Sequence, residues 1–193
     1  MRVGMPFFSG QPETMCGKGS TLEATAEVRE KLPALLTRLG VEKLLDAPCG
    51  DFNWMRLVVA DLPKMEYFGV DFDEMHIAKA RTSMLIMKLQ NCRFKVMDVV
   101  NARLPAADAV FSRDFFQHVT DDMALRALEG FRATGARLLI ATSHETKVNS
   151  DIDVIGGFRP IDLSKSPFNL GMPSEILDDP VGSGRILGVW NLR

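Results

Sequence analysis

The chain has 193 residues, 46% of them hydrophobic and 25% charged, with a net charge of −2. These values are typical of a single soluble globular domain. The sequence shows no basic stripe for nucleic-acid phosphates and no apolar run of about 18 residues for a membrane span. We therefore expect neither a nucleic-acid partner nor a membrane partner.

The cysteines indicate a reducing compartment. Cys16, Cys49 and Cys92 are odd in number, far apart in the chain, and form no C-x-x-C pair. This spacing argues against a disulfide framework and against a zinc site. We expect a cytoplasmic location and no bound metal.

The N-terminal part predicts an arm followed by a helix. Residues 1–19 are rich in glycine and proline and show little periodicity, so they are interpreted as an arm. Ser20–Glu23 fits a capping box at a helix start, and we favour this capping role over a fold of Ser20 across the ligand. Pro33 is expected to kink or split that helix, and Gly40 to end it in a left-handed cap.

Apolar runs then alternate with helical segments. We expect strands at 41–46, 67–71, 93–98, 109–112 and 137–142, and helices at 54–60, 73–89 and 122–131. Asp73 can cap the second of these helices. Alternation at this spacing predicts a parallel sheet with helices on both faces.

The last third of the chain breaks this alternation. Residues 145–174 are rich in Gly, Pro, Asn, Asp and Ser, which is typical of a functional loop, and we interpret them as a substrate loop. Residues 174–177 and 185–192 are expected to form an antiparallel hairpin joined by a turn at 179–184. The sequence thus predicts one α/β domain over 1–193, with a mostly parallel seven-stranded sheet.

Three of the predicted strands end in an acid. These residues are Asp46, Asp71 and Asp98, and open parallel sheets bind ligands beyond the carboxyl ends of their strands. Asp71 lies 21 positions after Gly50, close to the spacing of about 20 between a ligand-binding turn and a ribose-binding acid. Each acid could instead only cap a turn.

The loop after the first acid disfavours a dinucleotide. Pro48 removes an N–H donor, and Asp51 places a negative charge where phosphates would lie. A pyrophosphate needs closely approaching N–H groups, so a nicotinamide-dependent oxidoreductase is the less favoured alternative. A phosphate-free ligand with a cationic centre fits this loop better.

The stretch Leu44–Gly50, LLDAPCG, resembles the first motif of class I S-adenosylmethionine-dependent methyltransferases, hydrophobic-hydrophobic-Asp-x-Gly-x-Gly-x-Gly. Pro48 and Phe52 stand where that pattern has glycines. The resemblance implies a Rossmann-like, doubly wound fold, S-adenosylmethionine as cofactor, a ribose contact at Asp71 and an adenine contact at Asp98. The cofactor-binding residues that we infer are Asp46, Ala47, Cys49, Gly50, Asp51, Trp54, Asp71, Phe72, Asp98, Val99 and Ser112. Phe52 and Trp54 either form a wall near the sulfonium or belong to the core.

The run Ala109–His118 resembles the family's fourth motif, which lines the methyl-transfer channel. His118 is the first candidate for a general base because the imidazole pKa lies near neutrality. Asp114 could orient it, and His144, after the fifth strand, is the second candidate. A purely structural imidazole is the alternative for His118, and His76 is interpreted as a surface residue.

Substrate-binding candidates lie after the fourth strand and in the 145–174 loop. They are Arg113, Asn149, Arg159 and Phe168, with Arg159 suited to clamp a carboxylate or phosphate unless it is a solvated loop residue. We predict methyl transfer to an O or N atom of a small-molecule acceptor. The alternatives are a non-catalytic partner subunit, or methylation of RNA or protein, and a homodimer is a candidate assembly.

Overall fold

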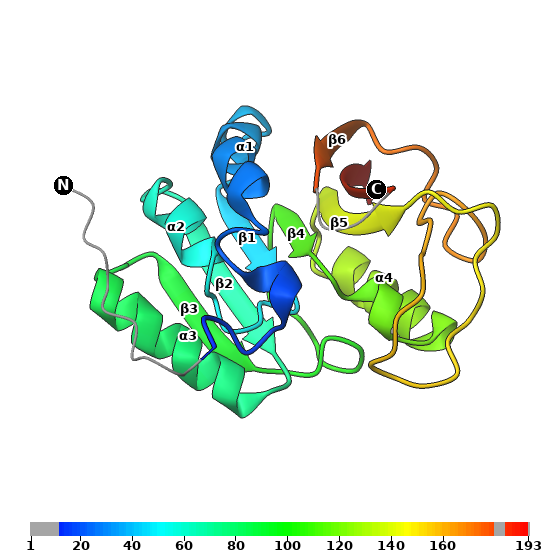
Figure 1. Cartoon of the computed structure of the whole chain (residues 1–193). Coiled ribbons are helices and arrows are strands. Elements are labelled where there is room, and N and C mark those ends of the chain that lie inside the picture. The colour runs from blue at the N-terminus through cyan, green and yellow to red at the C-terminus, as the bar shows by residue number, and fades with distance from the viewer. Residues whose placement is uncertain (1–11, 180–183, 193) are drawn as a thin grey trace.

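A computed structural model describes residues 12–179 and 184–192 of the chain. Seven strands form a single sheet in the order β3-β2-β1-β4-β5-β7-β6 (Figure 1). The first five strands of this order pair in parallel, whereas β7 pairs antiparallel with both β5 and β6. The predicted α/β fold and the C-terminal antiparallel hairpin are therefore confirmed.

The observed elements follow the predicted order. The strands are β1 (Lys43–Asp46), β2 (Glu66–Asp71), β3 (Cys92–Val96), β4 (Ala109–Ser112), β5 (Leu138–His144), β6 (Glu175–Asp178) and β7 (Arg185–Asn191). The helices are α1 (Ala26–Arg38), α2 (Met55–Ala60), α3 (Glu74–Met87) and α4 (Asp121–Ala133), with short 3-10 turns η1 (Lys18–Ser20) and η2 (Phe116–His118). Among the described residues, no helix is long and apolar enough to cross a membrane.

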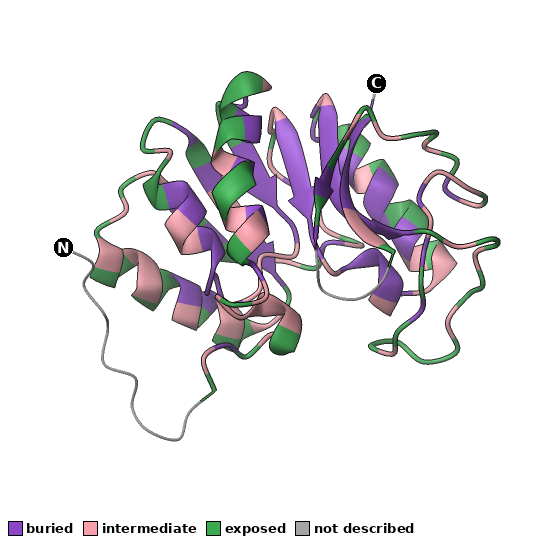
Figure 2. Cartoon of the chain, turned by 45° about the horizontal axis from the view of Figure 1, so that its top comes forward, coloured by how far each residue is buried: buried purple, intermediate pink, exposed green. Residues whose placement is uncertain are grey.

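Helices cover both faces of the sheet. Apolar residues of α1, α2 and α3 pack into one buried cluster, and those of α4 pack into a second cluster on the opposite face. Every residue of β4 and β5 is consequently buried, which Figure 2 shows as purple strands at the centre of the molecule. Parallel strands covered in this way expose their backbone ends only at the sheet rims, where a ligand can bind.

The first helix begins later than the sequence suggested. Ser20 ends the η1 turn, and α1 starts at Ala26 without a side-chain cap. The N–H of Leu22 donates to the carboxylate of Glu13 (2.6 Å), so the chain at this point is held by the arm and not by a capping box. The predicted capping role of Ser20 is therefore wrong.

Three other backbone predictions can be compared directly. Pro33 lies inside α1, which continues to Arg38, so Pro33 does not split the helix. The side chain of Asp73 accepts hydrogen bonds from the N–H groups of Met75 (2.7 Å) and His76 (3.4 Å), as expected for the cap of α3. Gly40 follows α1 with a φ of 62°, the left-handed conformation that we predicted.

Residues 145–174 contain no helix or strand, in agreement with the loop prediction. The preceding strand β5 is longer than predicted and reaches His144. This extension places His144 within the sheet instead of after it. The central residues of the predicted 179–184 turn lie outside the described residues.

Candidate active site

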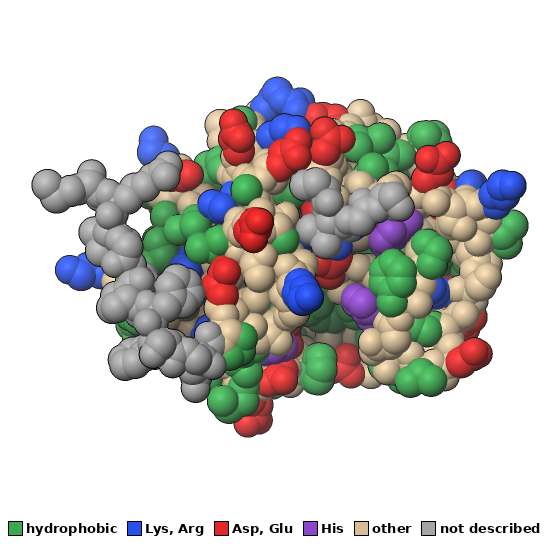
Figure 3. All heavy atoms as spheres, in the orientation of Figure 1, with side chains coloured by type: hydrophobic (Ala, Val, Ile, Leu, Met, Phe, Trp, Pro, Cys, Tyr) green, Lys and Arg blue, Asp and Glu red, His purple; other side chains and the backbone are tan. Residues whose placement is uncertain are grey.

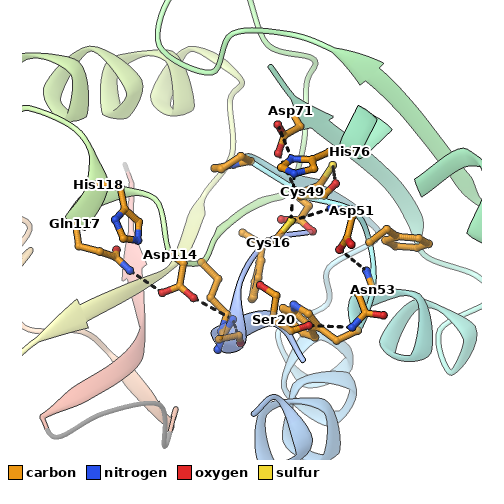
Figure 4. A pocket seen from close by; sticks show the side chains of 18 of the residues that line it. Cys16, Ser20, Cys49, Asp51, Asn53, Asp71, His76, Asp114, Gln117 and His118 are labelled. Carbon is orange, nitrogen blue, oxygen red and sulfur yellow. Dashed lines mark hydrogen bonds and ion pairs between the residues drawn. The ribbon is translucent and has the colours of Figure 1, made fainter. Parts of the chain in front are cut away.

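A cavity of about 390 Å³ lies at the carboxyl ends of the parallel strands (Figure 4). Its walls come from the N-terminal arm, the loop after β1, the end of β2, the segment after β4, and two residues of the C-terminal third, Phe158 and Arg185. The volume falls in the range of ligand pockets, roughly 300–1,000 Å³. The sheet topology therefore brings the motif-bearing segments to one site.

The loop after β1 keeps the left-handed turns of a glycine-rich loop, although Pro48 and Phe52 replace two of the pattern's glycines. Gly50 has a φ of 56° and Phe52 a φ of 59°, so a bulky side chain occupies the left-handed region, which is unfavourable without support. The ring of Phe52 is buried and packs against Tyr67 (5.0 Å between centroids) and Phe94 (4.8 Å). This packing supports the strained backbone, and Phe52 is both a core residue and part of the cavity wall.

Asp71 is held at the cavity wall by its neighbours. Its carboxylate accepts the N–H of Gly50 (2.9 Å) on one oxygen and the N–H of Asp73 (2.9 Å) on the other. The Nδ1 of His76 lies 3.3 Å from the same carboxylate, so His76 lines the cavity and is not the surface residue that we expected. Both carboxylate oxygens keep lone pairs for a ligand.

Asp46 provides a second, different carboxyl group. It is buried, and the hydroxyl of Tyr67 donates to it at 2.5 Å. Burial raises the pKa of Asp46 to about 8, and the hydrogen bond from Tyr67 offsets only part of this effect. Near neutral pH the cavity therefore combines a predominantly protonated acid at Asp46 with the carboxyl group of Asp71.

Asp51 does not present a free charge to a ligand. Its carboxylate accepts hydrogen bonds from the Thr14 hydroxyl (3.0 Å), the Met15 N–H (2.9 Å) and the Lys79 ammonium (2.7 Å). Burial raises its pKa, but the bonds from Lys79, Met15 and Thr14 outweigh burial and leave the pKa below its ordinary value. Asp51 thus holds the arm and also lines the cavity, and its predicted contact with the cofactor stays a prediction.

Asp98 departs most clearly from its predicted place. It lies two residues beyond the end of β3, is exposed, and does not line the cavity. Its carboxylate accepts the N–H of Val100 (2.8 Å) and the amide of Asn101 (2.6 Å), so it caps the following turn. The expected rim of three acids is corrected to two, Asp46 and Asp71.

The other predicted cofactor residues divide into two groups. Cys49, Gly50, Trp54 and Phe72 line the cavity together with Asp46, Asp51 and Asp71. Ala47, Val99 and Ser112 are buried and do not line it, because their side chains belong to the interior around the strand ends.

His118 lies on the opposite side of the cavity from Asp71 and His76 (Figure 4). Its Nδ1 is 2.5 Å from the carbonyl oxygen of Gly157. A carbonyl can only accept, so Nδ1 carries the proton and the neutral ring keeps its lone pair on Nε2. In its neutral form the ring therefore has Nε2 available to accept a proton, and the catalytic role of His118 stays a prediction.

Asp114 is held by charged partners and not by His118. Arg185 donates to its Oδ2 (2.9 Å), Arg113 lies 3.2 Å from the same oxygen, and the Gln117 amide donates to Oδ1 (2.6 Å). Its φ of 60° is a strained conformation at the end of β4. The expected role of orienting His118 is corrected, because the Gly157 carbonyl performs it.

Arg113 lines the cavity, but its donors are occupied. It makes two hydrogen bonds with the buried carboxylate of Asp179 (2.8 and 3.0 Å) and one with the carbonyl of Gly19 (3.0 Å). Its guanidinium also lies 5.4 Å from the ring centroid of Trp54. Arg113 is therefore a structural part of the wall, and its predicted contact with substrate stays a prediction.

The remaining predicted substrate residues shape the 145–174 loop and do not line the cavity. Asn149 donates to two carbonyls of the loop, Phe168 is buried in the core, and Arg159 pairs with Asp121 (2.7 Å). Because these contacts are internal, none of the three is placed to hold a substrate in this cavity.

His144 also lies outside the cavity lining. Its Nδ1 accepts the N–H of Ile161 (3.4 Å), and its ring packs against Phe158 (5.6 Å between centroids). Burial and the positive charge of Arg185 lower its pKa. His144 is therefore a structural support for Phe158, and the second candidate base is set aside.

Sequence reasoning overlooked several residues of the wall. They are Cys16, Gly19, Asn53, His76, Gln117, Phe158 and Arg185, and Ser20 lines the cavity as in the alternative that we had not favoured. Gln117 and Phe158 are sequence neighbours of predicted residues, and that adjacency was the available signal. The arm residues carry no such signal, since only the tertiary fold brings them to the site.

Comparisons with known proteins agree with this geometry. The family model described as a methyltransferase domain matches residues 44–134. The sequence has no significant match among curated proteins. Among solved structures, TnmH has a TM-score of 0.69 at 18% identity, over 88% of this chain and 55% of that one, so the chain spans about half of TnmH.

Two further structures show the same fold. The methyltransferase domain of bacterial CtHen1-C has a TM-score of 0.66 at 16% identity, with 87% of this chain and 98% of that one covered. Magnesium protoporphyrin IX methyltransferase (ChlM) from Synechocystis PCC 6803, solved with bound S-adenosylhomocysteine, has a TM-score of 0.64 at 13% identity, with 88% and 84% covered. Likenesses at these identities establish the fold.

The segment matched by the family model contains both acids of the rim and His118. The sheet order and the position of the cavity agree with that match. Residues 44–134 thus match a methyltransferase domain, and the chain shares the fold of solved methyltransferases.

Proposed function

We propose that the protein transfers the methyl group of S-adenosylmethionine to an O or N atom of a small-molecule acceptor. The observation that carries this proposal is that Asp71 and His118 line one cavity from opposite sides. A ribose-binding acid and a base are thereby available to the two reactants of one reaction.

The cavity fits an adenosyl sulfonium. Asp71 has acceptor capacity for the two ribose hydroxyls, a charge-assisted contact. Aromatic and apolar groups of Trp54, Phe111 and Phe72 provide the apolar wall. Bound S-adenosylmethionine supplies an electrophilic methyl group, and the protein has to hold the acceptor in line with it.

The same loop argues against a nicotinamide dinucleotide. The N–H of Cys49 donates to the Val70 carbonyl (2.8 Å), that of Gly50 to Asp71 (2.9 Å), and that of Asp51 to the sulfur of Cys16 (3.3 Å). A pyrophosphate cradle needs free N–H groups at this turn. These three donors are already used by the protein.

His118 supports an acceptor that loses a proton. A hydroxyl or an amine becomes a better nucleophile when its proton is removed as the new bond to carbon forms. The Nε2 lone pair of His118 can take that proton, because the Gly157 carbonyl fixes the proton of the ring on Nδ1. Phe158, with its ring centroid 6.1 Å from that of His118, offers a flat apolar surface for the rest of the acceptor.

A small acceptor is favoured over RNA or a protein. The 145–174 loop contributes only one residue, Phe158, to the cavity lining. On the face of the molecule drawn in Figure 3, acidic and basic side chains of the described residues are interspersed, without a continuous basic patch for a polyanion. This charge pattern supports recognition of a compact molecule within the cavity.

Calorimetric titration tests the proposal. We expect S-adenosylhomocysteine to bind with a Kd in the micromolar range and to raise the Tm, and NAD to do neither. Incubation with labelled S-adenosylmethionine and a panel of phenols and amines then tests transfer, with S-adenosylhomocysteine formation as the readout. Binding of NAD alone would contradict the assignment, and cofactor binding without transfer to any acceptor class would favour the non-catalytic subunit.

A further inference from the structure

Phe52 stands where the motif pattern has its last glycine, and the residues on either side of it, Asp51 and Asn53, meet the N-terminal arm. We propose that Asp51 and Asn53 are positioning residues that hold arm residues 13–20 in place as one wall of the cofactor pocket. This inference rests on the proposed function, because it assigns that wall to the S-adenosylmethionine site.

Asp51 forms the first anchor. Its carboxylate is 1% exposed and is bonded by the Thr14 hydroxyl, the Met15 N–H and the Lys79 ammonium. Lys79 also donates to the carbonyl of Glu13 (3.2 Å), so one cation bridges the loop and the arm. The N–H of Asn53 also donates to the carboxylate of Asp51 (3.2 Å). A buried carboxylate is tolerated only with such partners, and two of the four come from the arm.

Asn53 forms the second anchor. Its side-chain amide donates to the Glu13 carboxylate (2.7 Å) and to the Ser20 carbonyl (3.0 Å). The same oxygen of Glu13 accepts the N–H of Leu22 (2.6 Å). Asn53 is 2% exposed, so its amide is committed to the two ends of the arm segment.

The arm held in this way reaches the ligand cavity. Cys16, Gly19 and Ser20 line it, and Figure 4 shows Cys16 and Ser20 on the same side as Asp51 and Asn53. The sulfur of Cys16 lies only 2.7 Å from where a Cβ on Gly50 would be. Gly50 is therefore required both by its positive φ and by the close approach of the arm.

These contacts give the unusual loop a physical reason. The backbone of the loop keeps its path because Phe52 adopts the left-handed conformation. Asp51 and Asn53, on either side of Phe52, carry the side chains that bond the arm. A ligand that contacts Cys16 and Ser20 stabilises the docked arm, and the docked arm stabilises the bound ligand, since the two equilibria are linked. Cofactor affinity should thus depend on Asp51 and Asn53 through the arm that they dock.

Calorimetry with S-adenosylhomocysteine on the full chain provides the first test. Asp51→Asn and Asn53→Ala should each weaken binding by about tenfold or more, because each loses hydrogen bonds that dock the arm. The control is Asp108→Asn, since Asp108 also accepts two backbone N–H groups, from Glu42 (3.0 Å) and Lys43 (2.8 Å), at the opposite end of the sheet. Its affinity should equal that of the wild type.

Alkylation of Cys16, followed by peptide mass spectrometry, provides the second test. Burial, followed by the charge of Asp51, raises the pKa of Cys16 to about 12, so its reaction with N-ethylmaleimide should be slow. S-adenosylhomocysteine should slow it further in the wild type. Asn53→Ala should react several-fold faster with little protection, and it changes no charge beside the thiol.

The outcomes separate this inference from the proposed function. A wild type that binds no S-adenosylhomocysteine refutes the proposed function and this inference with it. A wild type that binds it, with both variants binding equally well, overturns the inference alone. If a variant does not fold, the wild-type alkylation decides, because a bound ligand that leaves Cys16 unprotected excludes the arm from the pocket wall.

Discussion

Replacing Asp71 by asparagine changes the proposed ribose-binding group with almost no change of shape. The carboxylate holds the N–H groups of Gly50 and Asp73, one on each oxygen. Asp71→Ala would remove both and disturb the loop itself, so its effect on a ligand would be difficult to interpret. Asp71→Asn keeps one acceptor oxygen and removes the charge.

The expected loss follows from the contacts. A hydrogen bond to a charged group contributes about 1.5–3 kcal/mol, and the substitution turns one acceptor into a donor that faces a ribose hydroxyl or a backbone N–H. A loss of about 2–3 kcal/mol corresponds to roughly 30- to 150-fold weaker binding of S-adenosylhomocysteine. One weakened backbone contact costs about 1 kcal/mol of unfolding free energy, or about 2–4 °C in Tm for a chain of this size.

Isothermal titration calorimetry of the variant measures this loss, with a melting curve to verify folding. Asp73→Asn is the matched control. Asp73 lies two residues from Asp71, its side chain caps α3, and it does not line the cavity, so the substitution makes the same chemical change outside the site. The control should bind like the wild type. Equal affinity of Asp71→Asn and the wild type would refute the ribose assignment.

Three further predictions concern other parts of the structure. His118→Ala should lower kcat by about 10²–10⁴-fold with any acceptor that is methylated while the Kd for S-adenosylhomocysteine stays unchanged, and an equal loss of both would indicate a structural role. Burial raises the pKa of Asp46 from 3.8 to about 8, so the folded state binds more protons and the free energy of unfolding should fall as the pH rises through that window. Asp46→Asn should flatten this fall in urea unfolding at about pH 5 and pH 8, and identical slopes would contradict the assignment. Arg159→Ala should destabilise the fold by about 3–5 kcal/mol, because it leaves the carboxylate of Asp121 without its cation, and it should not change acceptor KM; an unchanged Tm would contradict this.

The sheet was predictable because its strands are short apolar runs with acids or small residues at their ends. Strand β4 agrees with the prediction at both ends, 109–112, and the hairpin of β6 and β7 follows from two apolar runs around a turn. Local sequence patterns fix such elements. The start of α1 could not be derived in this way, because Glu13 and not a neighbouring cap bonds its entry.

The sequence predicted the site residues that lie at or just after the carboxyl end of a strand. It did not predict those whose position depends on tertiary contacts. Asp46 and Asp71 are the last residues of β1 and β2, His118 comes shortly after β4, and all three line the cavity. Asp98 also follows a strand, but its carboxylate caps its own turn. Arg159 looked like a substrate clamp in sequence, and only the fold reveals Asp121 as its partner.

The central claim is that the rim at Asp71 holds the adenosyl group and directs its sulfur toward His118. A crystal structure of the complex with S-adenosylhomocysteine measures this directly. The account predicts ribose hydroxyls within hydrogen-bond distance of Asp71, arm residues Cys16 and Ser20 against the ligand, and the sulfur facing Nε2 of His118. A ligand that contacts neither Asp71 nor the arm, or whose sulfur faces away from His118, would contradict it.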